Sequence, residues 1–119
     1  MSDQSSQRLT RDHGGWVVAR WSGEIDMVNA DDVGREALGG VANSDEGLVV
    51  DLSQVTYLDS AGIRTVVRLS RLLRQRQQLF SLVVPERSVL RSSLVVGGIP
   101  GMISTFRTLS EARAARAGA

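Results

Sequence analysis

The chain has 119 residues, of which 42% are hydrophobic and 23% charged, a composition that suits a single globular domain and argues against wholesale disorder. Its net charge is only +1, which disfavours a nucleic-acid-binding protein with a large basic surplus. Cysteine and lysine are both absent, which excludes disulfides, a cysteine nucleophile, Schiff-base chemistry, a Walker A phosphate loop and the lysine of a receiver domain.

The N-terminal half predicts strands on either side of one helix. The expected elements are, in order, a strand over 7–12, a turn at 13–15, a strand over 16–21, a helix over 29–38 and a strand over 47–52. The second strand, WVVARW, is apolar on both faces, as interior strands are, and its residues Trp16 and Trp21 lie on opposite faces. Apolar residues recur at helical spacing from Ala30 to Leu38, and a pair of glycines ends that helix.

The C-terminal half predicts a continued alternation of helices and strands. The expected elements are, in order, a helix over 60–75, a strand over 79–84, a helix over 88–96, a loop over 97–101, a strand over 102–106 and a helix from 108. Pro85 ends the first of these strands, GGIPG at 97–101 contains two structure-breaking dipeptides, and Ser110 is the expected cap of the last helix. This alternation predicts an α/β domain with parallel pairing, to which the early hairpin adds antiparallel pairing. The sequence therefore predicts a mixed sheet of four or five strands with about four helices.

The ends of the chain and its apolar runs bear on where the protein works. Residues 1–7 are polar and predict a flexible tail ahead of a single domain. No apolar run approaches the roughly 18 residues of a membrane-spanning helix. The polar N-terminus also lacks the apolar segment of a signal peptide. We therefore expect a cytoplasmic protein that does not insert into membranes.

One segment carries a distinctive combination of motifs. Residues 51–63, DLSQVTYLDSAGI, join a strand ending in D-L-S to a D-S-x-G-I sequence that begins a helix, and G-E-I-D occupies 23–26. These motifs, at these separations, resemble the STAS (sulfate transporter and anti-sigma factor antagonist) family over nearly the whole chain. The resemblance implies a single STAS-like domain over 8–117. It also implies a regulatory role that is not enzymatic and needs no cofactor or metal ion.

The resemblance further implies partners and a modification site. Anti-sigma factor antagonists of this family bind an anti-sigma factor that is also a serine kinase, and this binding releases the sigma factor. Phosphorylation of the serine in D-S-x-G abolishes the binding, and a serine phosphatase restores it. In this chain the phosphorylated residue would be Ser60, and the acidic residues Asp26 and Asp59 match motif positions beside it.

The residues themselves are compatible with such a switch. Ser60 lies at a predicted helix N-terminus, where it would be accessible, and the small residues Ala61 and Gly62 leave room for a partner. A phosphate adds a charge of about −1.5 to −2. Beside Asp59, and beside Asp26 if the fold brings it near, that charge would form an anionic patch that repels a partner. The alternative interpretation is an ordinary N-cap, in which the Ser60 hydroxyl accepts a backbone hydrogen bond; an unphosphorylated serine can play both roles.

The helix that begins at Ser60 carries a row of arginines. Arg64, Arg68 and Arg71 fall on one arc of this helix, separate from an apolar arc that includes Leu69. We interpret the row either as a solvated face or as a partner surface on which Arg64 and Arg68 meet acids of the kinase. The whole chain has a related asymmetry, with a net charge of −7 before Ser60 and +8 from Ser60 onward. This asymmetry averages out if the two halves interleave in the fold.

Two other classes of function remain open. A soluble STAS subunit could dock on a membrane transporter or a lipid-transport ATPase, and a small enzyme or ligand carrier could share the α/β shape. A triad of Ser60, His13 and Asp26 has no nucleophile elbow or oxyanion loop around it. One histidine and scattered carboxylates predict no metal site, and the scarcity of aromatic residues predicts no direct binding of nucleic acid.

Overall fold

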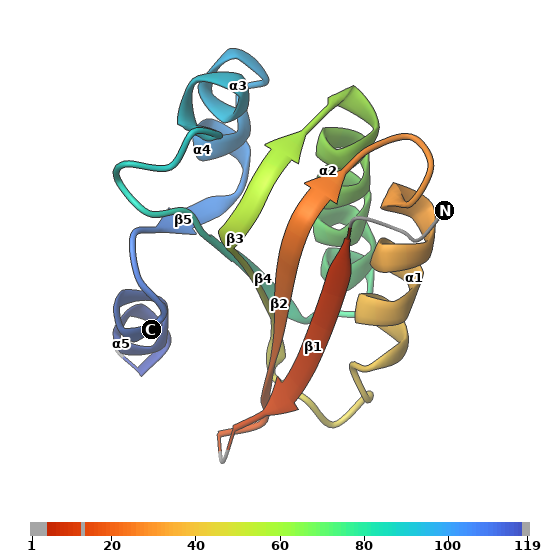
Figure 1. The fold of residues 1–119 in the computed structure, drawn as a ribbon. Coiled ribbons are helices and arrows are strands. Elements are labelled where there is room, and N and C mark those ends of the chain that lie inside the picture. Colours follow the sequence, from red (N-terminus) through yellow and green to blue (C-terminus); the bar gives the residue numbers. More distant parts are fainter. Residues whose placement is uncertain (1–4, 13, 118–119) are drawn as a thin grey trace.

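A mixed sheet with helices on both faces makes up the part of the chain that the computed structural model describes, residues 5–12 and 14–117 (Figure 1). The strands are β1 (Ser6–Arg11), β2 (Trp16–Ile25), β3 (Gly47–Leu58), β4 (Leu79–Val83) and β5 (Ser104–Phe106). The helices are α1 (Ala30–Gly39), α2 (Ser60–Gln75), α3 (Arg91–Val96), α4 (Ile99–Met102) and α5 (Leu109–Ala117). The strands lie in the order β1-β2-β3-β4-β5, with β1 antiparallel to β2 and the other neighbours parallel. The predicted α/β fold with a mixed sheet is confirmed.

Apolar side chains on the two faces of the sheet form two separate cores. The larger core lies between the sheet and helices α1 and α2, and includes the fully buried Trp21 of β2 and Leu73 of α2. The smaller core lies under α5 and contains Trp16 and Val18 of β2 with Ala112 of α5. The two tryptophans therefore lie on opposite faces, as predicted, because side chains alternate along a strand. Beyond α5, this second face of the sheet is uncovered over β1 and the adjoining part of β2 (Figure 1).

Strand β3 continues to Leu58, well past the end that the sequence predicted. The predicted end of this strand at residue 52 is wrong because Asp51 forms part of a β-bulge, beyond which the strand continues. Its Oδ1 accepts the amide of Ser53 at 2.9 Å, and the register with β2 shifts between the pairs Arg20–Asp51 and Ser22–Gln54. This bulge absorbs one extra residue of β3, and a second register shift, between the pairs Gly23–Val55 and Glu24–Tyr57, absorbs another. The strand therefore stays paired with β2, and its last residues lie beside the carboxyl end of β2.

The prediction of a loop over residues 97–101 is wrong for 99–101, because the single-turn helix α4 begins at Ile99 and ends at Met102. Gly98 precedes the helix with a positive φ of 74°, a conformation that glycine adopts without strain. Pro100 lies in the first turn, where its missing amide hydrogen costs no helical bond, and Ile99 is fully buried. Helix α3 is shorter than predicted and begins at Arg91. The described residues therefore contain five helices, where the sequence predicted about four.

The two ends of the domain differ from prediction in detail. β1 begins at Ser6, inside the expected tail of residues 1–7. The first four residues and His13 lie outside the described residues. Ser110 is not the cap of α5, because the Thr108 hydroxyl accepts the backbone amide of residue 111 at 3.1 Å. No described helix is long and apolar enough to cross a membrane.

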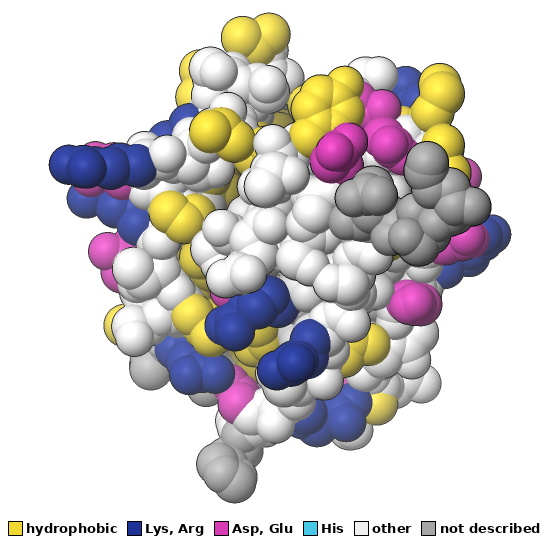
Figure 2. Space-filling view, in the orientation of Figure 1, with side chains coloured by type: hydrophobic (Ala, Val, Ile, Leu, Met, Phe, Trp, Pro, Cys, Tyr) yellow, Lys and Arg dark blue, Asp and Glu magenta, His cyan; other side chains and the backbone are white. Residues whose placement is uncertain are grey.

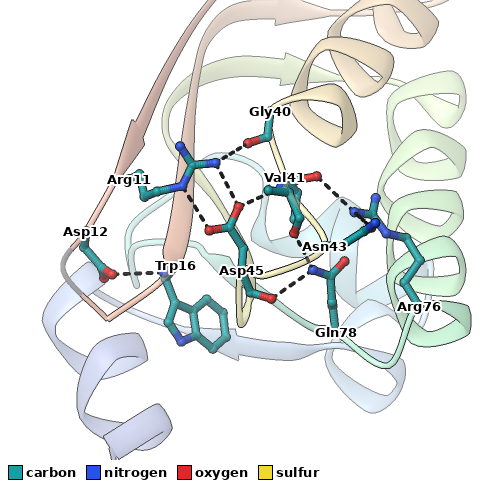
Figure 3. Close-up of polar contacts among 10 residues, drawn as sticks. Arg11, Asp12, Trp16, Gly40, Val41, Asn43, Asp45, Arg76 and Gln78 are labelled. Carbon is teal, nitrogen blue, oxygen red and sulfur yellow. Dashed lines mark hydrogen bonds and ion pairs between the residues drawn. The ribbon is translucent and has the colours of Figure 1, made fainter.

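A polar network fastens the loop between α1 and β3 to strand β1 and to the end of α2 (Figure 3). Asp45 of this loop is buried and accepts two bonds from Arg11, from Nε at 2.9 Å and Nη2 at 2.8 Å. The Ala42 amide donates to the same carboxylate at 2.6 Å. Gln78 donates to the carbonyls of Ala42 and Asp45, and Arg76 donates to another carbonyl of the loop at 2.9 Å. These contacts hold the end of the domain opposite to Ser60.

The contact between Arg11 and Asp45 makes stability depend on acid pH. The hydrogen bond from Arg11 lowers the pKa of Asp45 below its ordinary value. A depressed carboxylate pKa stabilises the fold above the unfolded-state pKa of about 4, and this contribution is lost as pH falls through the folded-state pKa. We expect Asp45→Asn to lower the melting temperature at neutral pH by about 5 °C, and the variant to lose less further stability below about pH 4 than the wild type. Thermal melts across the acid range check this, and equally steep acid limbs would contradict it.

Candidate functional site

Ser60 lies where β3 ends and α2 begins, at the edge of the sheet that holds the carboxyl ends of the parallel strands (Figure 1). It is the first residue of α2 and is exposed. Asp59 is the N-cap of this helix, and its Oδ1 accepts the amides of Ala61 at 2.8 Å and Gly62 at 3.0 Å. The alternative of Ser60 as the N-cap is therefore wrong. No hydrogen bond from another described residue engages the Ser60 hydroxyl, because Asp59 has taken the capping role.

Asp59 also connects α2 to the segment that follows β2. Its Oδ2 accepts the Met27 amide at 3.1 Å, and its own amide donates to the Ile25 carbonyl at 3.2 Å. Asp26 lies in the same segment, and its carboxylate accepts the Val28 amide at 3.0 Å. The structure thus brings Asp26 and Asp59 to the same edge of the sheet. The expected anionic patch around a phosphorylated Ser60 requires that these two carboxylates lie close to the serine.

Gly62 allows α2 to approach the sheet closely. It is buried, and a side chain there would place Cβ 2.4 Å from Cδ1 of Leu58 and 3.2 Å from the carbonyl oxygen of Ile25. Ala61 is half-buried and packs against the larger core. The domain itself fills the space next to Ala61 and Gly62, so Ser60 is the exposed residue of the D-S-A-G sequence.

Asp59→Asn should separate the two roles of this carboxylate. The asparagine Oδ1 can still cap α2, but the side-chain NH2 group cannot accept the Met27 amide. We expect a small change in melting temperature, together with hydrogen exchange at the Met27 amide that is at least about tenfold faster. Asp59→Ala removes both contacts and should lower the free energy of unfolding by about 1–2 kcal/mol. Exchange measured by NMR and denaturant melts check both variants, and unchanged exchange at Met27 would contradict the bridging role.

A shallow groove includes Ser60, and exposed apolar side chains lie in it and near it. The groove is lined by Tyr57, Leu58, Asp59, Ser60, Ile63, Ser92, Ser93 and Val96. We call Met27, Val28, Tyr57 and Val96 the apolar rim; they are 79%, 83%, 51% and 88% exposed. Hydrophobic and acidic side chains gather along this edge of the molecule (Figure 2). Large apolar side chains that remain this exposed around one groove indicate a surface that a partner covers.

Sequence reasoning did not find the apolar rim. The position of Met27 and Val28 in the sequence could have indicated that they are exposed. They lie between the G-E-I-D motif and the first helix, outside the apolar pattern of either element. Val96 stands at the end of α3, directly before two glycines. Apolar residues in such places are read as core unless the fold shows that no neighbour covers them.

The arginine row of α2 lies beside the acidic face of α1. Arg64 and Arg68 are exposed, and Nη1 of Arg68 lies 3.8 Å from Oδ1 of Asp31. Leu69 is buried and Leu72 half-buried, so the row has no exposed apolar centre of its own. Acids of the first half of the chain thus lie next to arginines of the second half. The charge asymmetry of the sequence is partly neutralised at this place.

Known proteins share this fold. A profile of the STAS domain family matches residues 7–112. The anti-sigma-F factor antagonist RsfB of Mycobacterium tuberculosis (strain ATCC 25618 / H37Rv) is 34% identical over 102 residues, which cover 85% of this chain and 81% of that protein. An anti-sigma factor antagonist from Mycobacterium paratuberculosis has a crystal structure with a TM-score of 0.81 and 30% identity, covering 93% of this chain and 92% of that one. SpoIIAA in its unphosphorylated form has the same fold, with a TM-score of 0.76, 19% identity and coverage of 96% and 98%.

Proposed function

We propose that this chain, which belongs to the STAS domain family, acts as an anti-sigma factor antagonist in a partner-switching pathway. It binds an anti-sigma factor with serine kinase activity while Ser60 is unmodified, and it is released once Ser60 carries a phosphate. A serine phosphatase then restores binding. The names of the mycobacterial relatives support the anti-sigma factor as partner. The pathway operates in the cytoplasm, and the chain is a binding protein whose partner supplies both ATP and catalysis.

The observation that carries the proposal is the free, exposed hydroxyl of Ser60 beside a helix whose cap is another residue. A kinase substrate must present its hydroxyl without first breaking the local fold. Because Asp59 caps α2, transfer of a phosphoryl group to Ser60 would leave the cap bonds to Ala61 and Gly62 in place. The helix N-terminus also tolerates an added negative charge. Phosphorylation would therefore change the surface and leave the domain folded.

The surroundings of Ser60 explain why a phosphate would end binding. The apolar rim gives a partner exposed hydrophobic area near the serine, since Tyr57 and Val96 line the groove with Ser60 and the Met27 amide is bonded to Asp59. An apolar contact requires close packing without water. A phosphate in this groove would carry about two negative charges and a hydration shell into that contact. Asp26 and Asp59 lie at the same edge, so the added charge meets like charges that are already present. Arg64 and Arg68 extend the same side of the molecule along α2, and we assign them contacts with acids at the margin of the partner surface.

Phosphate mapping with the cognate kinase tests the proposal. We expect mass spectrometry to find one phosphate, on Ser60, after incubation with the anti-sigma factor and ATP, and none on Ser60→Ala. The unmodified chain used as bait should capture the same anti-sigma factor from its native cells. Phosphate on another residue would overturn the assignment of Ser60. Capture of transporter subunits or a lipid-transport ATPase in place of an anti-sigma factor would overturn the partner and favour a docking subunit.

A further inference from the structure

A polar hollow lies on the uncovered face of the sheet, beyond α5 and opposite to α1 and α2. It has a volume of about 390 Å³. Its lining comes from β1, β2 and one residue of β3, namely Ser6, Gln7, Arg8, Arg20, Ser22 and Gln54. Basic side chains stand over this part of the sheet, next to a broad uncharged surface (Figure 2). The lining contains two positive charges and no acidic side chain, so its chemistry suits an anion.

A buried carboxylate holds Arg20 in position. Nε of Arg20 donates to Oδ2 of Asp51 at 3.2 Å, and the side chains are 49% and 5% exposed, respectively. Asp51 is itself fixed, because its Oδ1 accepts the Ser53 amide at the β-bulge. The contact uses Nε, so the two terminal nitrogens of Arg20 remain as donors that no other described residue engages. The guanidinium group is thus oriented before any ligand arrives, which lowers the entropic cost of binding.

Arg8 lies directly opposite Arg20 on the neighbouring strand. The two residues are register partners in the antiparallel pair of β1 and β2, and both line the hollow. Like charges in this arrangement destabilise a sheet. Asp51 compensates the charge of Arg20, whereas Arg8 forms no ion pair with any described residue. The next register pair on the same face of the sheet, Ser6 and Ser22, places two hydrogen-bonded hydroxyl groups near this uncompensated charge.

We propose that this hollow binds the phosphate group of a small molecule. Arg8 and the terminal nitrogens of Arg20 donate to the phosphate oxygens, and charge-assisted bonds of this kind are the strongest that surface side chains make with oxyanions. The hydroxyl proton that the Ser6–Ser22 pair does not use internally and the amide of Gln54 supply neutral donors around them. The bound anion removes the repulsion between the two opposed arginines. A second copy of this chain is a poor occupant, because it would bring four arginines together.

Titration with inorganic phosphate, followed by NMR of the 15N-labelled full chain at constant ionic strength, tests this inference. We expect saturable shifts at the amides of Arg8 and Ser22 and at Nε–H of Arg20. Arg8→Gln should weaken binding about tenfold, because it removes one charge-assisted contact. Arg71→Gln, which removes the same charge from an exposed position on α2, should leave the affinity unchanged. These two variants separate a local site from attraction by net charge.

Two further experiments identify the ligand class and distinguish loss of binding from loss of folding. Arg20→Lys keeps the positive charge but loses the planar donor group that Asp51 orients; it should weaken binding while its melting curve stays cooperative. Glycerol 3-phosphate is the second probe, and tighter binding than inorganic phosphate identifies a phosphate monoester as the ligand class. Shifts that never saturate, equal shifts with sodium chloride alone, or an unchanged affinity in Arg8→Gln would overturn the inference. It uses none of the residues around Ser60, so it stands or falls independently of the partner switch.

Discussion

Ser60→Glu should bind the anti-sigma factor at least about 100-fold more weakly than the wild type, a loss of about 3 kcal/mol, whereas Ser60→Ala should bind unchanged. Glutamate places a carboxylate in the groove that Tyr57 and Val96 line, at the edge of the sheet that holds the acids Asp26 and Asp59. Bringing a partner against it requires removal of its water and adds repulsion between like charges. Alanine removes a hydroxyl that bonds to no other described residue, so it changes neither charge nor packing. Isothermal titration calorimetry with the purified partner measures both variants.

A matched control distinguishes this effect from a general one. Ser110 is exposed in the first turn of α5, and Ser110→Glu adds the same charge in a comparable helical position away from the groove. Both glutamates lie near a helix N-terminus, where the dipole favours them, so both proteins should melt at or above the temperature of the wild type. Equal weakening by Ser60→Glu and Ser110→Glu would point to net charge as the cause. Undiminished binding by Ser60→Glu would remove the basis for a phosphate switch at this site.

The sequence predicts the extent of helix α2, but it does not predict which residue caps the helix. The predicted helix over 60–75 rests on a long apolar period, and α2 spans Ser60–Gln75. Asp59 and Ser60 are both good capping residues, and local sequence does not choose between them. The choice depends on the Met27 amide, which comes from the segment after β2 and holds the other oxygen of Asp59. A contact between distant parts of the chain thus leaves Ser60 free, and no local rule contains that information.

The early predicted end of β3 also reflects contacts between distant parts of the chain. Asp51 looks like the end of a strand, since acidic residues are rare within sheets. It stays within β3 because Arg20 of the neighbouring strand and the Ser53 amide satisfy its two oxygens. The apolar rim could not be separated from core residues, because exposure is a property of the packed fold. The fold class follows from local pattern, and the proposed phosphoacceptor position follows from the motif, whereas the surface around Ser60 depends on tertiary contacts.

Gly62→Ala is expected to lower the free energy of unfolding by about 2 kcal/mol and to weaken partner binding without any change in charge. The new methyl group would lie 2.4 Å from Cδ1 of Leu58 and 3.2 Å from the carbonyl oxygen of Ile25. Leu58 is 4% exposed and packed in the larger core, so it has little room to move away. The first turn of α2 must therefore shift outward. That shift moves Ser60 relative to the apolar rim, and it strains the cap bonds that Asp59 makes.

Gly39→Ala is the matched control, because Gly39 is also helical and nothing lies within 4 Å of the position that its Cβ would occupy. Alanine there should raise the free energy of unfolding by about 0.5–1 kcal/mol, through its better helix propensity, and leave partner binding unchanged. Denaturant melts and calorimetry on both variants give the comparison. If Gly62→Ala is as stable as Gly39→Ala, then α2 does not need the close approach at Gly62. If Gly62→Ala is destabilised but binds its partner with full affinity, then partner binding does not depend on the exact position of Ser60 relative to the sheet. In that case the charge added by the phosphate is sufficient to end binding.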